Sequence, residues 1–301
     1  MPLVSVPARI KLQNILFATD FSPSAQLALT YALNIARSYE AELCSVNVIP
    51  HMPFVEAVEP DIEQIRLSAT QRMTAWSGSG FLRGVKHKEL IEEGEIPAVI
   101  SKLVRDYNID LIVIGTGGRE RLAKLLLGSV AEDVFRHAEC PVLTVGPHAL
   151  PWKDGCLRHV MFATDFGPES EHGLPYAIAF AEANRAFLTM LHASPEPSLP
   201  LPEPEPGSLP VFDREEVVAS TQKKLRALIP EANQLWHEPE YMVQFGSAAE
   251  TIVKAAQGAD MIVLGVKRPT PLTKHLGAGI AYKVACEAPC PVLSVGARYH
   301  V

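Results

Sequence analysis

The chain repeats itself with a spacing of about 150 residues. The run ILFATDFSP at residues 15–23 returns as VMFATDFGP at residues 160–168, and CPVLTVG at 140–146 returns as CPVLSVG at 290–296. The segments recur in the same order along the chain. Solenoid repeats are far shorter, at about 20–50 residues, so this period indicates a duplicated domain.

The repeat determines the expected domain organisation. A length of 301 residues agrees with two domains at about 150 residues each. We expect the first domain at residues 1–147 and the second at 156–301, with a linker at 148–155 between them. The second domain carries an insertion at residues 194–210 that contains seven prolines. Proline removes backbone donors and favours an extended chain, so the insertion is either a surface spacer or a docking site for a proline-binding module.

Composition excludes several functional classes. The formal net charge is −7, so the basic surface that general nucleic-acid binding requires is missing. No apolar run reaches the roughly 18 residues that cross a membrane, and the first ten residues show no export signal. The five cysteines follow no zinc or redox pattern and are expected to be reduced and buried. We therefore expect a cytoplasmic protein with no nucleic-acid or membrane partner.

Apolar strands and amphipathic helices alternate along each half. In the first half, the expected strands are residues 15–19, 43–49, 85–91, 111–114 and 142–145, and the expected helices are 24–39, 62–76, 96–107 and 129–137. The second half repeats this order. Such alternation with continuously apolar strands is typical of an α/β fold, in which a parallel sheet is covered by helices on both faces.

A glycine motif follows the fourth strand of the first half. Gly115, Gly118, Gly128 and Ser129 form the pattern G-x2-G-x9-G-S. Glycine permits a tight turn with positive φ and lets a ligand approach the backbone, while the start of the next helix offers free N–H groups to a phosphate. The alternative is that the glycines merely end a strand and begin a helix. The complete spacing at the carboxyl end of a parallel strand favours a ligand site.

Three cations lie inside this motif, and a carboxylate follows the first strand. Arg119, Arg121 and Lys124 could add positive charge near a phosphate. Asp20 leaves a buried strand and needs donors, which a nucleoside would supply, or it could offset the dipole of the following helix. Asp165 occupies the same place in the second half, so the aspartate alone does not distinguish these roles.

Each half resembles a universal stress protein domain, and the first half also carries the glycine motif of the ATP-binding members together with Asp20 within Ala18-Thr19-Asp20. The resemblance implies two tandem Rossmann-like domains, each with a five-stranded parallel sheet and ATP above its carboxyl edge. It also implies that Val48 lies beside the adenine and that Mg²⁺ is held through the phosphates. The ATP-binding residues that it implies are Ala18, Thr19, Asp20, Val48, Gly115, Thr116, Gly118, Arg119, Gly128, Ser129 and Val130.

The second half has lost the motif. Arg268 stands where the first half has Gly118, Pro269 follows it, and Ala278-Gly279 replaces Gly128-Ser129. A long side chain and a Cβ now occupy positions where the backbone should approach phosphate. We therefore expect ATP in the first half alone, with the second half structural or regulatory. Its own cations, Lys267, Arg268 and Lys274, could hold an anion or form a solvated loop.

The expected function is that of an ATP-binding stress-response regulator. A slow ATPase and a nucleotide-independent scaffold remain as alternatives. No P-loop, nucleophile elbow or histidine metal pattern is present, so we assign neither catalytic residues nor a protein metal site.

Each half ends in a short apolar strand, at residues 142–145 and 292–295. A strand at a sheet edge exposes unpaired backbone groups, which proteins usually cover. We expect the two strands to meet about a pseudo-twofold axis, as a built-in dimer. A homodimer of the whole chain is left open.

Overall fold

The computed structural model describes residues 10–50, 61–78, 80–117, 129–196, 213–229, 235–267 and 279–296. The elements of the first half are β1 (Asn14–Ala18), α1 (Pro23–Tyr39), β2 (Glu42–Ile49), α2 (Ile62–Gly78), β3 (His87–Glu93), α3 (Ile96–Asp106), β4 (Leu111–Gly115), α4 (Ser129–His137) and β5 (Val142–Val145). A 3-10 turn, η1 (Lys153–Gly155), lies between the halves. The second half contains β6 (His159–Ala163), α5 (Pro168–Glu171), α6 (Leu174–Asn184), β7 (Phe187–Ser194), α7 (Arg214–Leu228), β8 (Glu240–Phe245), α8 (Ala248–Ala255), β9 (Met261–Val266), α9 (Ile280–Glu287) and β10 (Val292–Gly296).

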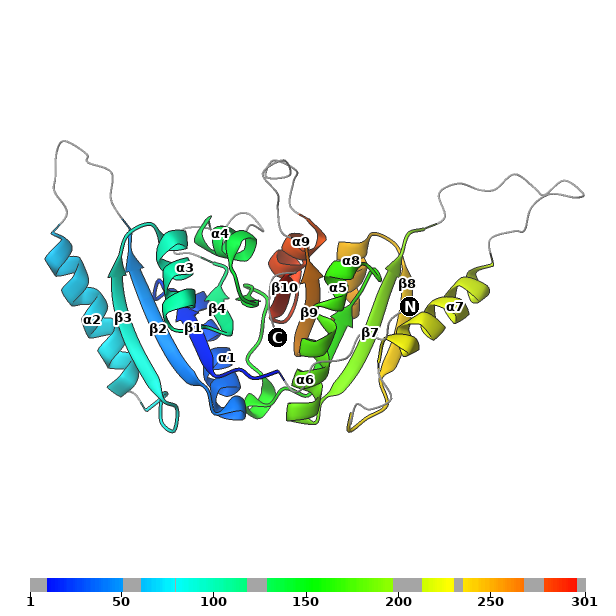
Figure 1. Ribbon diagram of the computed structural model, residues 1–301, viewed down its shortest axis with the longest axis horizontal. Coiled ribbons are helices and arrows are strands. Elements are labelled where there is room, and N and C mark those ends of the chain that lie inside the picture. Colours follow the sequence, from blue (N-terminus) through cyan, green and yellow to red (C-terminus); the bar gives the residue numbers. More distant parts are fainter. Residues whose placement is uncertain are drawn as a thin grey trace, which may run out of the picture.

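All ten strands belong to one sheet with the order β3-β2-β1-β4-β5-β10-β9-β6-β7-β8. Neighbouring strands run parallel within each half, and β5 and β10 pair antiparallel where the halves meet. In Figure 1, α2 and α7 flank opposite ends of the molecule and β10 lies near its middle. The expected α/β fold with two similar halves is confirmed, and the two five-stranded sheets join into one.

The start of α1 is capped by a side chain. Ser22 is the N-cap residue, and its Oγ accepts a hydrogen bond from the backbone N–H of Ala25 at 3.2 Å. Pro23 stands in the first turn, where its missing N–H costs nothing. The helix therefore begins one residue before the predicted start at residue 24.

The third strand and the first helix of the second half differ from the predicted pattern. The third strand runs from His87 to Glu93 instead of 85–91, because Val85 ends a turn in which its N–H donates to Leu82 O at 3.0 Å. Val85 is buried from that turn, so its apolar character does not mark a strand. In the second half, the first helix is divided into α5 and α6 by a turn at residues 172–173.

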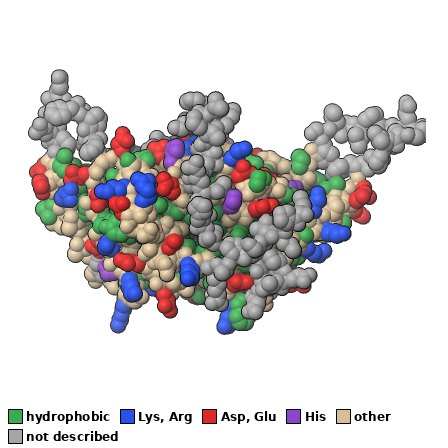
Figure 2. Space-filling model, in the orientation of Figure 1, with side chains coloured by type: hydrophobic (Ala, Val, Ile, Leu, Met, Phe, Trp, Pro, Cys, Tyr) green, Lys and Arg blue, Asp and Glu red, His purple; other side chains and the backbone are tan. Residues whose placement is uncertain are grey.

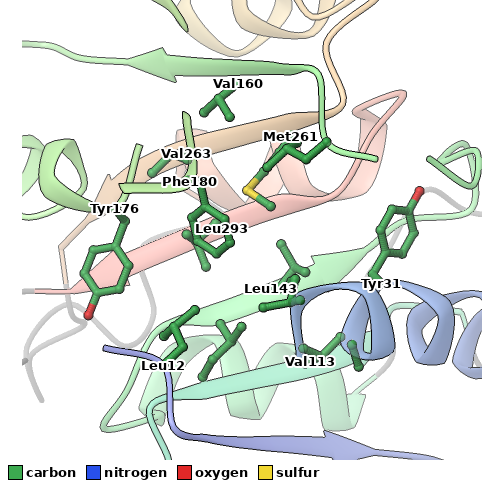
Figure 3. Packing of buried hydrophobic residues seen from close by; sticks show 14 of the residues in the cluster. Leu12, Tyr31, Val113, Leu143, Val160, Tyr176, Phe180, Met261, Val263 and Leu293 are labelled. Atoms are coloured by element: carbon green, nitrogen blue, oxygen red, sulfur yellow. The ribbon is translucent and has the colours of Figure 1, made fainter. Parts of the chain in front are cut away.

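Helices on the two faces of the sheet cover two large apolar clusters. One of them includes Leu143 of β5 and Leu293 of β10, which are direct partners in the strand register. Figure 3 shows side chains from both halves packing around this pair, among them Tyr31 and Met261. The apolar core therefore runs continuously across the junction between the halves.

The junction has pseudo-twofold symmetry. Leu293 is the counterpart of Leu143 at the 150-residue spacing, so each strand meets its own copy at this point. The pairing joins the two terminal strands that the sequence analysis expected to meet. The residues beside this pair differ between the two strands, since Thr144 of β5 is equivalent to Ser294 of β10. Thr144 Oγ1 donates a hydrogen bond to Val292 O at 3.1 Å.

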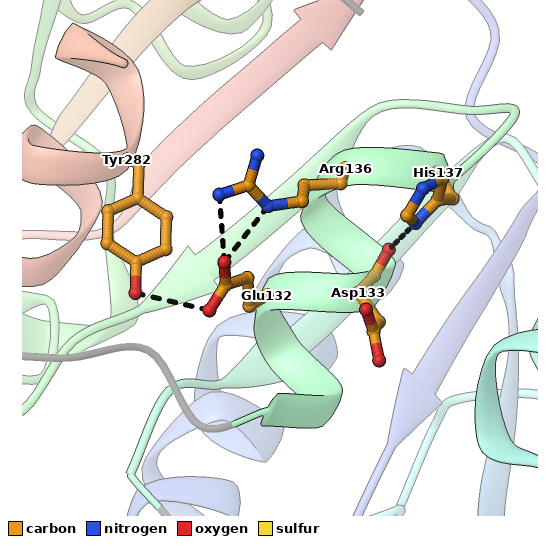
Figure 4. Close-up of polar contacts among 5 residues, drawn as sticks. All are labelled: Glu132, Asp133, Arg136, His137 and Tyr282. Carbon is orange, nitrogen blue, oxygen red and sulfur yellow. Dashed lines mark hydrogen bonds and ion pairs between the residues drawn. The ribbon is translucent and has the colours of Figure 1, made fainter. Parts of the chain in front are cut away.

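A polar contact between α4 and α9 adds to this junction. The Arg136 guanidinium donates to Glu132 Oε1 at 3.0 and 2.8 Å, and the Tyr282 hydroxyl donates to Glu132 Oε2 at 3.4 Å (Figure 4). The rings of Phe135 and Tyr282 also meet edge to face, with centroids 6.4 Å apart. Tyr282 is the counterpart of Glu132, so the halves are complementary here instead of identical.

The segment between the halves packs against both of them. Trp152 is buried, its ring lies 5.1 Å from the Tyr31 ring, and its Nε1–H donates to Asp260 O at 2.8 Å. The Tyr31 hydroxyl donates to Leu150 O. This segment therefore holds α1 of the first half next to the start of β9 in the second.

The cysteines differ from the expectation at one position. Cys44, Cys140, Cys286 and Cys290 are buried, but Cys156 is exposed because it follows the surface turn η1. On the face shown in Figure 2, acidic and basic side chains are interspersed. In the described parts of the chain, no helix is long and apolar enough to cross a lipid bilayer.

Candidate functional site

The candidate site lies at the carboxyl edge of the first half, where β1 is flanked by β2 and β4. Connections leave β1 and β4 toward different sides at this point, and open α/β sheets bind ligands at such a position. Ala18 is the buried last residue of β1, and Thr19 and Asp20 follow it directly. The exits of these strands therefore determine which side chains can reach a ligand.

Local hydrogen bonds shape the exit of β1. Thr19 N–H donates to Val46 O at 2.9 Å, and Thr19 Oγ1 accepts from the N–H of Phe21 at 2.8 Å. Phe21 has a φ of 62°, an uncommon conformation for a bulky residue. Asp20 Oδ1 accepts from Ser22 N–H at 2.8 Å, so this exposed carboxylate is held beside the start of α1. The exit is a rigid turn that presents Asp20 to solvent.

The end of β2 is tied to the same turn. Asn47 Nδ2 donates to Thr19 O at 2.8 Å, so a side chain of β2 fixes the backbone that follows β1. Val48 comes next and is partly buried against the second apolar cluster. These contacts place Val48 and Asp20 along one cleft.

The cleft has a volume of about 610 Å³ and opens between these strand ends and α2. Its walls combine polar and apolar side chains, which suits a ligand that is itself partly aromatic and partly polar. The lining residues are Asp20, Phe21, Asn47, Val48, Ile49, Pro50, Gln64, Ile65, Ser68, Ala69 and Arg72.

Arg72 of α2 is held in place by Phe21. Its guanidinium lies over the Phe21 ring, 4.5 Å from the centroid, and its Nη2 donates to Phe21 O at 3.2 Å. The Phe21 ring also meets the Trp76 ring edge to face at 5.1 Å. The cation is thus positioned before any ligand arrives.

Gly115 does not have the positive φ that the sequence predicted for the glycines of the motif. Glycine is required at this position for packing. The φ of Gly115 is not among the positive values of the described residues. A Cβ built on Gly115 would lie 2.7 Å from the backbone carbonyl carbon of Ser24 and 2.9 Å from Ala25 N. Only glycine lets the start of α1 approach the end of β4 this closely. The Ser24 hydroxyl also donates to Gly117 O, so α1 fixes the beginning of the loop after β4.

Thr116 turns away from the exposed edge. It is buried, and both its N–H and its hydroxyl donate to Val145 O, at 3.0 and 3.3 Å. Ser129 begins α4, and the next residue, Val130, is half-buried against the second apolar cluster. The predicted residues Gly118, Arg119 and Gly128, and the cations Arg121 and Lys124, lie outside the described residues.

The sequence analysis missed the polar lining that comes from β2 and α2. Asn47 could not be distinguished from an ordinary strand residue. Gln64, Ser68 and Arg72 do carry a signal, because a spacing of four residues places them on one face of a helix. Among the described residues, no group of three or more His, Cys, Asp or Glu could hold a metal ion.

Comparison with known families identifies the chain. The model of the universal stress protein family matches twice, at residues 11–146 and 157–296. The chain belongs to the universal stress protein family. A relative from Staphylococcus aureus (strain USA300), named as a universal stress protein, is 33% identical over 147 residues, which are 47% of this chain and 89% of the relative.

Solved structures agree with the fold of this universal stress protein. A universal stress protein from Archaeoglobus fulgidus matches with a TM-score of 0.69 at 19% identity, covering 95% of this chain and 97% of that one. A protein of unknown function from Pseudomonas aeruginosa PAO1 matches with a TM-score of 0.58 at 16% identity, covering 95% and 93%. Both similarities extend over both halves, so the tandem arrangement occurs in solved structures as well.

Proposed function

We propose that this universal stress protein binds ATP in its first half and uses nucleotide occupancy to regulate its partners during stress. The cleft beside Asp20 is the observation that carries the proposal. It joins an exposed carboxylate, apolar walls from Val48 and Ile49, and the positioned guanidinium of Arg72 at the carboxyl edge of β1 and β2. A nucleoside has matching parts, with hydroxyl donors for the carboxylate and a flat base for the apolar walls.

The phosphates of the proposed ATP would extend toward the glycine motif. That motif follows β4, and β4 is the neighbour of β1 on the side away from β2. Backbone N–H groups of the motif and the start of α4 at Ser129 would bind the phosphate oxygens. Arg119 would add positive charge. Mg²⁺ would be carried mainly by the phosphates, in keeping with its preference for phosphate and water ligands.

The second half would serve a structural or regulatory role. It lacks the G-x2-G-x9-G-S pattern, and Arg268 replaces the second glycine. It contributes to the junction between the halves, because β10 pairs with β5 and Tyr282 contacts Glu132. The proposal therefore requires one nucleotide per chain.

The decisive experiment counts nucleotides on the intact chain. Mass spectrometry of small molecules released from freshly purified, denatured protein should detect ATP, and calorimetry with Mg²⁺-ATP should give one site per chain. Two equivalent sites would overturn the assignment to the first half, and an absence of binding at saturating ATP would overturn the nucleotide proposal. A phosphate-release assay separates a regulator that keeps its ATP from a slow ATPase.

A further inference from the structure

One face of α2 lines the cleft with both polar and apolar side chains, the apolar ones being Ile65 and Ala69. Gln64, Ser68 and Arg72 follow one another at four-residue steps and all three line the cleft. We name these three residues the α2 stripe. The helix begins in a defined orientation, because Asp61 Oδ1 accepts a hydrogen bond from Gln64 N–H at 3.0 Å. The α2 stripe therefore supplies the polar side chains on the α2 side of the cleft.

The position of α2 limits which part of a ligand it can touch. The helix connects β2 to β3 and packs against both strands. The glycine motif follows β4, on the opposite side of β1. A nucleotide that spans this edge would therefore meet the α2 stripe at one end and the phosphate-binding motif at the other.

Phe21 restricts the way in which Arg72 can act. The aromatic ring covers one side of the guanidinium, and the Phe21 carbonyl oxygen engages one of its N–H groups. Arg72 lines the cleft together with Asp20, Val48 and Ile49. A planar cation held in this way can stack on a heterocyclic base and donate hydrogen bonds at its edge.

We infer that the α2 stripe recognises the nucleoside end of the ligand, and that Arg72 is a specificity-determining residue for the base and not a phosphate ligand. This inference rests on the proposed function. Gln64 and Ser68 supply both donors and acceptors for the base edge or the ribose hydroxyls. A cation beside a nucleotide ordinarily binds a phosphate, whereas the proposed partner of Arg72 is the base.

The test compares ATP, ADP and AMP on the full chain by displacement of a fluorescent ATP analogue. Arg72→Ala should lower the affinity for all three nucleotides by the same factor, about tenfold or more, because they share the nucleoside. Gln64→Ala should weaken all three by a smaller common factor of about threefold. Arg66→Ala is the matched control, because Arg66 is on the same helix but pairs with Glu93 of β3 outside the cleft. It should leave all three affinities unchanged.

Two results would overturn the inference. If the loss of affinity in Arg72→Ala grows from AMP to ADP to ATP, Arg72 contacts a phosphate. If the affinities are unchanged in both Arg72→Ala and Gln64→Ala, α2 does not contact the nucleotide. Because Gln64 is exposed on the helix surface, Gln64→Ala tests the stripe even if the loss of Arg72 disturbs Phe21. Failure of the wild type to bind any nucleotide is a separate outcome, since it refutes the proposed function itself.

Discussion

The two halves share the same turn after their first strand. Thr19 and Thr164 each donate from the backbone N–H to the neighbouring strand at 2.9 Å, and each hydroxyl accepts from the N–H two residues later. Asp20 and Asp165 each accept from the N–H two residues later, both at 2.8 Å. Even the unusual φ is retained, at 62° for Phe21 and 60° for Phe166.

The side chains that cover this turn differ between the halves. In the first half, Asn47 bonds to the carbonyl oxygen of Thr19, and Arg72 lies over Phe21. In the second half, His192 Nδ1 lies 2.8 Å from the equivalent carbonyl oxygen, and its own ring packs on Phe166 with centroids 4.7 Å apart. The backbone of the edge is thus maintained by packing and local hydrogen bonds, whereas the chemistry that it presents is free to diverge.

The largest expected effect concerns Gly115, the last residue of β4, and its counterpart Gly265, which stands one residue before the end of β9. A Cβ on Gly265 would lie 2.1 Å from Glu169 O, closer than the 2.7 Å between a Cβ on Gly115 and the Ser24 backbone. Both contacts are with backbone atoms, which cannot easily move away. We expect Gly265→Ala to lower the free energy of unfolding by about 3 kcal/mol or more, and Gly115→Ala by about 1–3 kcal/mol.

Chemical denaturation of the full chain measures both effects. The matched control is Gly78→Ala at the end of α2, where an added Cβ meets nothing within 4 Å. This substitution should change stability by less than about 0.5 kcal/mol. If Gly115→Ala behaved like the control, the close packing of α1 on β4 would not be the reason for glycine at that position.

The next substitution gives the first half the residue that the second half has at the equivalent position. Gly118→Arg places a long side chain where the proposed phosphate cradle needs bare backbone. Losing two hydrogen bonds to a charged acceptor should weaken ATP binding about a hundredfold or more, because each contributes roughly 1.5–3 kcal/mol. Calorimetry measures the affinity, and an unchanged unfolding midpoint shows that the fold is intact.

The reverse substitution sharpens this comparison. Arg268→Gly restores one glycine of the second half but leaves Ala278 in place of the third glycine of the motif. We expect the stoichiometry of this variant to remain one ATP per chain. Unchanged affinity in Gly118→Arg would show that the phosphates bind elsewhere.

A smaller difference is expected at the junction of the halves. Thr144 and Ser294 are equivalent and both buried, but only the Thr144 hydroxyl has a partner, whereas Ser294 Oγ has none in the part of the chain that the structure describes. Removing a satisfied hydroxyl costs stability, whereas removing a buried unsatisfied one does not. Thr144→Val should therefore destabilise the chain by about 1 kcal/mol, and Ser294→Ala should be neutral or slightly stabilising. Equal losses in thermal unfolding would contradict the asymmetry.

The smallest effect is a loss of stability at alkaline pH. Burial raises the pKa of Cys44 to about 11 and that of Cys290 to about 12, from an ordinary value of 9.0. Above about pH 9 the unfolded chain releases thiol protons that the folded chain keeps, so unfolding becomes more favourable as the pH rises. The contribution of each thiol to the free energy of unfolding is fully present below about pH 9, and it is lost as the pH rises through the pKa of the folded state.

We expect each thiol to account for a loss of less than about 1 kcal/mol in the free energy of unfolding by pH 9.5. Unfolding free energies measured in reductant from pH 8 to 9.5 would test this, with Cys290→Ala showing a shallower decline than the wild type. Burial also raises the pKa of Tyr31 and Tyr39, so a decline should remain in that variant. A pH-independent stability would show that the folded thiols ionise as easily as the unfolded ones.

The sequence by itself predicted the duplication and the order of strands and helices correctly. These features depend on local patterns, since apolar periodicity, prolines and capping residues act over a few positions along the chain. The sequence also identified Gly115 as a special position, but the positive φ that it predicted there is wrong. The contact that requires glycine there is with Ser24, about ninety residues earlier in the chain.

Only the tertiary structure decided which side chains share the cleft with Asp20. Arg72 meets Phe21 across 51 residues of sequence, and Asn47 reaches the carbonyl oxygen of Thr19 from the next strand. The exposure of Cys156 and the burial of Trp152 were likewise decided by how the segment between the halves folds back on them. Such contacts depend on how helices and strands pack, and packing brings together residues that no local pattern in the sequence relates.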